Sequence, residues 1–311
     1  MSRIDAHHHV WRPASAPPSA TDHGPRRRVH AWLDAPGMYP LRRDFTLEDL
    51  APAAGAAGVD RTVLVQVLPD VDETVEFLAL AAAGDTVAGV VGWADLTADG
   101  LTGTLDALRA APGGDRLVGL RHLVQNESDP GWLNRPDVRR GLRTLARAGL
   151  TFDLLVLPHQ LPAAISAVRE LPELTFVLDH LAKPPIATGE LRPWATLIRE
   201  LAALPQVFCK LSGMVTEAEW HNWNVTALRP YAEVVLDAFG PRRVMFGSDW
   251  PVCLLAAAYG EVVDAAEELT AGLTAAERSQ VFAGTAERAY RLVERDVSGR
   301  AGDKGPWGVV R

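Results

Sequence analysis

Eight short runs with many apolar residues alternate with segments of helical periodicity along this chain of 311 residues. We interpret the runs as strands, and they cover residues 4–10, 62–67, 88–94, 118–123, 152–156, 175–179, 207–211 and 244–247. The helical segments cover residues 47–57, 72–83, 101–110, 136–148, 161–171, 193–204, 230–239, 258–269 and 275–292. Several runs are apolar almost throughout, which is typical of parallel strands covered by helices on both faces. Eight strand–helix repeats predict an α/β fold, a single-domain (β/α)8 TIM barrel.

The predicted barrel occupies residues 1–296, and a Gly-rich C-terminal extension follows at 297–311. The segment 11–44 is too long for an ordinary loop after a strand. Because it follows the first strand, we expect this long first loop to cover the mouth of the barrel, where Trp32 could stack on a ligand. Anchoring of the loop by a buried Trp32 is the equally plausible interpretation.

An open doubly wound sheet is the competing fold. No Gly-x-Gly-x-x-Gly turn follows the first strand, which disfavours the dinucleotide-binding form of such a sheet. Pro136, Pro193 and Pro230 favour helix starts at or near these positions, because proline is preferred in the first helical turn. Thr274 with Glu277 predicts a capping box at another helix start.

The composition argues against several classes of function. Hydrophobic residues make up 48% of the chain and charged residues 23%, as expected for a globular protein with a large core. The net charge of −8 and the lack of a basic stripe argue against nucleic-acid binding. No apolar run approaches the ~18 residues of a membrane span, and the two cysteines give no disulfide framework. We therefore expect a cytoplasmic protein that binds neither nucleic acid nor membrane, and homo-oligomeric assembly is left open.

Chemically active residues occur in the first and last of the predicted strands. In Asp5-Ala-His-His-His, His7 and His9 share one face and His8 lies on the other, because side chains alternate along a strand. The last strand ends in Gly-Ser-Asp, which exposes the carboxylate of Asp249. A His-x-His pair with a carboxylate suits hydrolysis assisted by a metal or a general base. The competing interpretations are an ordinary polar strand end and a tag remnant, and no linker supports the latter.

Further polar residues lie where the other predicted strands end, which is the rim that holds ligands in a barrel. They are Gln66, Arg121, His122, His159, Asp179, His180, Lys183 and Lys210. A lone histidine is more often a hydrogen-bonded core residue, and Arg121 or Lys210 could equally be half of a structural ion pair. The concentration of these groups on one rim nevertheless favours a functional site.

Five motifs together resemble the amidohydrolase superfamily (amidohydrolase family 2). They are Asp5-Ala-His-His-His-Val-Trp, Gly119-Leu-Arg-His, Asp179-His-Leu-Ala-Lys-Pro, Lys210-Leu-Ser-Gly and Phe246-Gly-Ser-Asp-Trp-Pro-Val. The chain is most similar to the sugar-lactone hydrolase branch, which includes the L-fuconolactonase, L-rhamnonolactonase and 2-pyrone-4,6-dicarboxylate lactonase types. The resemblance extends from about residue 4 to residue 292. It implies a lactonase of carbohydrate metabolism, a hydrolase that opens a small sugar lactone to its aldonic acid.

The resemblance also implies roles for individual residues. Asp249 is implied to handle the proton of the attacking water, with His180 and His122 as further catalytic residues. His7 and His9 are implied to bind a metal together with Asp249. The implied substrate-binding residues are Gln66, Arg121, His159, Lys210 and Trp32. The fourth strand lacks a lysine that could bridge two metals, so we expect one divalent ion, zinc or manganese, or a metal-free site.

Two other functions compete with lactone hydrolysis. Sister families of the superfamily catalyse zinc-dependent, non-oxidative decarboxylation of unsaturated or aromatic acids. They resemble this chain at the His-x-His pair and at Asp249, and less so at Lys210-Leu-Ser-Gly. The second alternative is a catalytically silent barrel that binds a ligand, which the intact pair and Asp249 disfavour and which fold alone never excludes.

Overall fold

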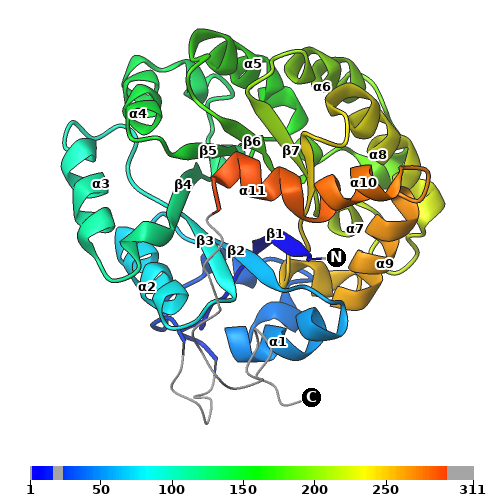
Figure 1. Ribbon diagram of the computed structural model, residues 1–311, viewed down its shortest axis with the longest axis horizontal. Helices are drawn as coiled ribbons and strands as arrows, with labels where there is room; N and C mark the ends of the chain where they lie inside the picture. Colours follow the sequence, from blue (N-terminus) through cyan, green and yellow to red (C-terminus); the bar gives the residue numbers. More distant parts are fainter. Residues whose placement is uncertain (1, 17–23, 293–311) are drawn as a thin grey trace.

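Eight parallel strands form one sheet in the order β1 to β8 in the computed structural model, which describes residues 2–16 and 24–292 (Figure 1). The strands are β1 Ile4–His8, β2 Arg61–Val65, β3 Val87–Gly92, β4 Leu117–His122, β5 Thr151–Leu154, β6 Phe176–Leu178, β7 Val207–Leu211 and β8 Val244–Phe246. The sheet closes beyond β8, where Asp249 N donates to His7 O at 2.8 Å and His9 N donates to Trp250 O at 2.7 Å. The predicted single-domain (β/α)8 barrel is confirmed.

Helices surround the barrel (Figure 1). They are α1 Leu47–Ala56, α2 Val71–Ala82, α3 Leu101–Ala110, α4 Pro136–Arg147, α5 Leu161–Glu170, α6 Trp194–Ala202, α7 Met214–Glu217, α8 Val225–Phe239, α9 Tyr259–Leu269, α10 Ala275–Ser279 and α11 Thr285–Tyr290. Two predictions were wrong in detail. Pro230 lies inside α8, which begins after Asn224 because the Asn224 side chain accepts from Ala227 N. A π-helical turn, Gln280–Gly284, separates α10 from α11 in the predicted final helix.

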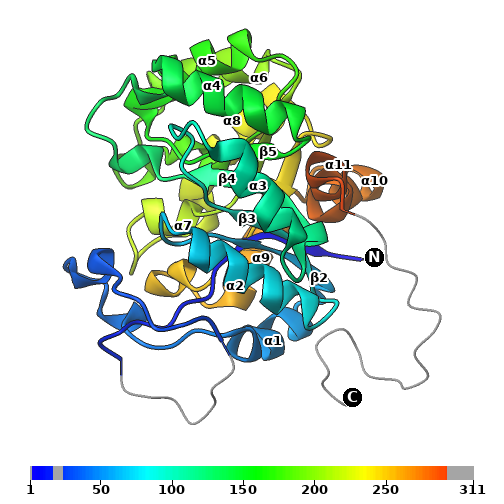
Figure 2. The same ribbon diagram turned by 90° about the vertical axis from the view of Figure 1, so that its left-hand side faces the viewer.

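The interior of the barrel is apolar at the end where the strands begin. α11 crosses this end, and Figure 2 shows α10 and α11 on the side opposite the long first loop. The apolar cluster that joins strands and helix contains Val63, Val65, Val91, Val177, Met245, Ala286 and Tyr290. The polar mouth therefore lies at the other end, where the strands terminate.

Of the long first loop, residues 11–16 and 24–44 are described, and residues 24–44 lie beside the loops that follow β7 and β8. Its 3₁₀ turn Tyr39–Leu41 lies close to the turn Val252–Leu255. A Cβ on Gly37 would lie 2.9 Å from the Trp220 ring, so backbone and ring are in close contact. This location supports the predicted cover over the mouth. The predicted extension, 297–311, lies outside the described residues, in which no helix combines the length and hydrophobicity that a membrane span requires.

Candidate active site

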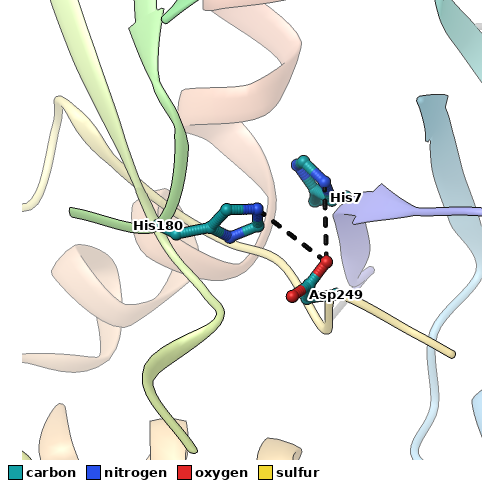
Figure 3. Close-up of side chains that lie close together, drawn as sticks. All are labelled: His7, His180 and Asp249. Carbon is teal, nitrogen blue, oxygen red and sulfur yellow. Dashed lines mark ion pairs between the residues drawn. The ribbon is translucent and has the colours of Figure 1, made fainter. Parts of the chain in front are cut away.

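Three imidazole nitrogens converge on one carboxylate oxygen at the mouth of the barrel. His7 Nε2 lies 3.1 Å from His9 Nε2, and Asp249 Oδ1 lies 3.7, 3.5 and 3.8 Å from the Nε2 atoms of His7, His9 and His180. Figure 3 shows the rings of His7 and His180 beside the same oxygen of Asp249. Ligands about 2.05 Å from a tetrahedral zinc ion lie about 3.3 Å apart. His7, His180 and Asp249 each offer a ligand atom within 4.8 Å of the others, so these three residues form a candidate metal centre, and His9 Nε2 lies beside it.

Asp249 is held in a conformation that non-glycine residues rarely adopt. Its φ is 57°, in the left-handed region that aspartate tolerates better than most residues. The buried Asp5 carboxylate accepts bonds from Ser248 N at 2.8 Å and Ser248 Oγ at 2.6 Å. Ser248 Oγ in turn accepts from Trp250 N at 3.0 Å. The residues on both sides of Asp249 are thus fixed, and the carboxylate is aimed at the histidines.

His180 begins a second strained segment directly after β6. Residues 180–183 all have φ between 50° and 59°, which is unusual for consecutive residues other than glycine. Trp194 Nε1 donates to Leu181 O at 2.7 Å, and Lys183 Nζ pairs with Glu217 at 2.5 Å. Such strain persists only where surrounding contacts impose it, and it concentrates at functional sites. This left-handed backbone directs the His180 side chain from the end of β6 toward the mouth of the barrel.

Hydrogen bonds at the Nδ1 atoms of His9 and His180 can leave the Nε2 atoms of these histidines unprotonated. His9 Nδ1 lies 2.8 Å from Val65 O, and because a carbonyl only accepts, this nitrogen carries the proton. His180 Nδ1 lies 2.8 Å from Ser212 Oγ, which can accept in the same way. Both Nε2 atoms can then present a lone pair to a cation, the usual arrangement of metal-binding histidines.

The charges around the site match metal binding at neutral pH. Burial lowers the pKa of His180 to about 4, and burial with the Lys210 charge lowers the pKa of His7 well below 6.5. Burial alone would raise the pKa of Asp249, but His180 and His9 outweigh it and lower this pKa below 3.8. Neutral imidazoles and an ionised carboxylate are the protonation states that a divalent cation requires.

A fully buried ion cluster lies directly beneath His7. Lys210 Nζ lies 2.6 Å from Asp153 Oδ2, 2.9 Å from Asp179 Oδ1 and 3.0 Å from His7 Nδ1. Arg121 donates to Asp179 Oδ2 at 3.1 Å. Burial opposes ionisation of Asp179, but Lys210 and His7 outweigh it and hold its pKa well below 3.8. Two cations thus balance two carboxylates inside the barrel, which is the condition for burying charge at tolerable cost.

The other predicted site residues occupy four different places. Gln66 and Arg121 are buried, and Arg121 NH2 donates a hydrogen bond to Gln66 Oε1 at 3.0 Å. Arg121 NH1 lies 3.3 Å from His7 Nε2. His122 stacks on Trp132 at 4.2 Å, accepts from Trp93 Nε1 at 3.3 Å and lies 2.7 Å from Glu127. His159 is exposed on the turn after β5, and half-buried Trp32 meets the edge of Trp11 at 5.2 Å. The roles of these residues stay predictions.

Several supporting residues were not singled out from the sequence. They are Asp5, Asp153, Ser212, Ser248, Tyr259 and Tyr290. Regular strand alternation would place Asp5 on the face of His7 and His9, but β1 is irregular between Asp5 and His8, and Asp5 instead accepts from Tyr259 of α9. No sequence pattern pointed to Asp153 or Tyr290, since their partners come from strands and a helix far away in the sequence.

Comparison with known proteins agrees with this geometry. The fold and site define a (β/α)8 barrel with a histidine–carboxylate centre at its C-terminal rim, and the model of the amidohydrolase family matches residues 4–292. The chain belongs to the amidohydrolase family. It is 39% identical over 303 residues to an L-fucono-1,5-lactonase of Burkholderia multivorans, covering 94% of this chain and 97% of that protein. An L-fucono-1,5-lactonase of Burkholderia ambifaria is 37% identical, and the match covers 93% of this chain and 96% of that protein.

A solved structure adds information on the metal. A crystal structure of an amidohydrolase from Burkholderia multivorans with bound zinc is 38% identical to this chain and superimposes with a TM-score of 0.85. The superposition covers 94% of this chain and 100% of that one. A divalent metal is thus supported at the candidate centre.

Proposed function

We propose that this protein hydrolyses a small sugar lactone to its aldonic acid, with a deoxy sugar lactone of the fucose type as the first choice of substrate. The observation that carries the proposal is the convergence of three imidazole nitrogens on Asp249 Oδ1 at the barrel mouth. The substrate class is supported by two relatives, 39% and 37% identical over nearly their whole length, which are L-fucono-1,5-lactonases.

We assign one divalent ion to His7, His180 and Asp249, with His9 as a fourth donor, and zinc as the first choice before manganese. When bound, such an ion polarises the lactone carbonyl and lowers the pKa of water. The sequence of β4, Leu-Val-Gly-Leu-Arg-His, offers no lysine for a bridge between two ions, which favours one. Full activity after exhaustive chelation would instead mean that the histidines bind the substrate carbonyl directly.

Hydrolysis of a lactone requires a base for water and an acid for the departing ring oxygen. Asp249 is ionised at neutral pH because its pKa is lowered, so it can accept a proton from the attacking water. The same carboxyl can then return that proton to the ring oxygen, since base and acid act in different steps. Arg121, 3.3 Å from His7 Nε2, provides a fixed cation near the negative charge that develops on the carbonyl oxygen.

The remaining residues divide between the rim and the interior. We propose that Trp32 and His159 contact the hydroxyl groups of the sugar, because they lie on the first loop and on the turn after β5. His122, predicted as a catalytic residue, lies where β4 ends, and we propose that it acts at this rim. Gln66 and Lys210 lie deeper, and their contacts favour positioning of Arg121 and His7 over the direct substrate contact predicted from the sequence.

Acid release from a panel of aldonolactones, with and without chelator, tests the proposal. Asp249→Asn should lower kcat by about 10²–10⁴ while the protein stays folded. Asp106→Asn, at an exposed position of α3, is the matched control and should leave kcat unchanged. Retention of more than about a third of kcat by Asp249→Asn would remove this residue from the mechanism. Release of carbon dioxide from an aromatic acid, with every lactone intact, would replace the proposal by decarboxylation.

We also propose the remaining properties predicted from the sequence: a cytoplasmic location and no nucleic-acid or membrane partner, with homo-oligomeric assembly as an open alternative to a monomer. Size-exclusion chromatography with light scattering tests the assembly. An acidic net charge of −8 supports the absence of a nucleic-acid partner.

A further inference from the structure

The last described helix reaches the active site from the opposite end of the barrel. Tyr290, at the end of α11, is only 2% exposed, and its hydroxyl donates to Asp153 Oδ2 at 2.7 Å. The ring of Tyr290 also lies beneath Lys210, whose Nζ is 5.4 Å from the ring centroid. A helix that closes the bottom of the barrel therefore contributes a polar group to the ion cluster beneath His7.

A continuous series of buried contacts leads from Tyr290 to the candidate metal centre. Asp153 Oδ2 accepts from both Tyr290 and Lys210, and Lys210 lies between Asp153 and Asp179. Asp179 Oδ1 lies 3.4 Å from His7 Nδ1. Asp153 Oδ1 has no hydrogen-bond partner in the described structure, so the orientation of Asp153 depends on Tyr290 and Lys210 alone.

His7 Nδ1 has two competing neighbours. Lys210 Nζ, which can only donate, is within hydrogen-bond distance at 3.0 Å, whereas Asp179 Oδ1, which can only accept when ionised, lies at 3.4 Å and makes no hydrogen bond in the described structure. If Nδ1 accepts from Lys210, the ring proton of neutral His7 sits on Nε2, and Nε2 has no lone pair for a cation. If Nδ1 instead donates to Asp179, Nε2 has a lone pair, which faces Arg121 NH1 at 3.3 Å in this structure and can bind a cation in its place. The position of Lys210 between these groups therefore controls whether His7 can be a ligand.

We propose that Tyr290 is a positioning residue for His7: its hydroxyl fixes Asp153, and Asp153 then holds Lys210 when the Nδ1 proton of His7 turns to Asp179 for metal binding. This inference rests on the proposed function only in placing a divalent ion on His7. It gives α11 a role in the active site, although the helix lies at the end of the barrel away from the mouth (Figure 2). Removal of one hydroxyl from α11 should therefore weaken metal binding.

Tyr290→Phe is the direct test, since it removes the hydroxyl and keeps the ring beneath Lys210. The dissociation constant for zinc is measured by competition with a chromogenic chelator, and kcat and KM are measured on the best lactone. We expect zinc binding about tenfold weaker, the lower end for residues that orient metal ligands, and a lower kcat at nearly unchanged KM. Tyr231→Phe is the matched control, because this buried tyrosine donates to the carbonyls of Pro185 and Glu190 outside the cluster.

A double-mutant cycle separates a positioning role from a merely structural one. Asp153→Asn should weaken zinc binding at least as much as Tyr290→Phe, and adding Tyr290→Phe to it should change little, because both act through Lys210. Zinc binding by Tyr290→Phe equal to that of the wild type, or additive effects of the two substitutions, would overturn the inference. A wild-type protein that binds no zinc would overturn it as well. Failure of every lactone, with weakened zinc binding in Tyr290→Phe, would overturn only the proposed function.

Discussion

Replacement of Gly213 by alanine would show how closely the position of His180 is determined by the backbone after β7. Gly213 has a φ of +64°, and a Cβ built there would lie 2.7 Å from His180 Nδ1 and 2.8 Å from His180 Cγ. Ser212, the preceding residue, holds the same Nδ1 at 2.8 Å. The imidazole of His180 thus packs directly against Gly213. Any shift of the ring would break its hydrogen bond to Ser212 or increase its distance from Asp249.

Two effects of Gly213→Ala can be estimated separately. The left-handed backbone costs an alanine roughly 1–2 kcal/mol. A non-bonded contact needs about 3.5 Å, so the ring must also move by roughly 0.8 Å. Misplacement of a group in an active site by about 1 Å can lower the rate about 10²-fold. Disturbed support of a metal ligand typically weakens metal binding about 10–100-fold.

Gly189→Ala separates these two effects. Gly189 has a similar φ of +74°, but a Cβ there has no heavy atom within 4 Å. In both variants the free energy of unfolding, measured in urea, should therefore be lower than in the wild type by roughly 1–2 kcal/mol. Only Gly213→Ala should also show weaker zinc binding in chelator competition and a lower kcat for lactone hydrolysis. Equal zinc affinity and equal kcat in the two variants would refute the placement of His180 as a ligand supported by Gly213.

Two further predictions concern the first loop and the loop after β2. Trp32→Ala should raise KM more than it lowers stability, and an unchanged KM with a large fall in Tm would identify a structural anchor. Glu73 accepts from Val67 N and Leu68 N, and burial raises its pKa from 4.5 to about 7. Because the folded state then binds the proton more tightly, the resulting stability is present below pH 4.5 and is lost as pH rises through 7. From pH 5 to pH 8 the free energy of unfolding, measured in urea, should fall by about 2–3 kcal/mol more in the wild type than in Glu73→Gln. Parallel pH profiles of the two proteins would contradict this.

The sequence allowed the barrel to be predicted because each strand is covered on both faces. The apolar runs are nearly continuous, so all eight strands fall within or within one residue of the predicted ranges. The helices were harder to define at their ends. Pro230 suggested a helix start, but the Asn224 cap lies six residues before the predicted start at residue 230, and the N-cap bond outweighs the preference of proline for the first turn.

His7, His9 and Asp249, predicted as metal ligands, converge with His180, predicted as a catalytic residue, for a reason that is visible in the sequence. His7 and His9 alternate along one strand face, and His180 and Asp249 follow other strands whose ends meet on the same rim. The ion cluster could not be predicted in this way. Lys210 was placed on the rim as a substrate contact, yet it is fully buried between Asp153 and Asp179. Only the closed barrel brings these side chains of β5, β7 and the segment after β6 together.

This ion cluster is difficult to explain by stability alone. A buried group of charges is often no more stabilising than apolar side chains of the same volume, whereas loss of one member leaves an unpaired charge that costs about 3–5 kcal/mol. An apolar replacement would fill the space beneath His7 but could neither accept nor repel the proton on His7 Nδ1. Asp179 and Lys210 are the groups that can do this, and both lie within 3.4 Å of that nitrogen. We therefore propose that these buried charges serve to control the ring proton of His7, the proposed metal ligand.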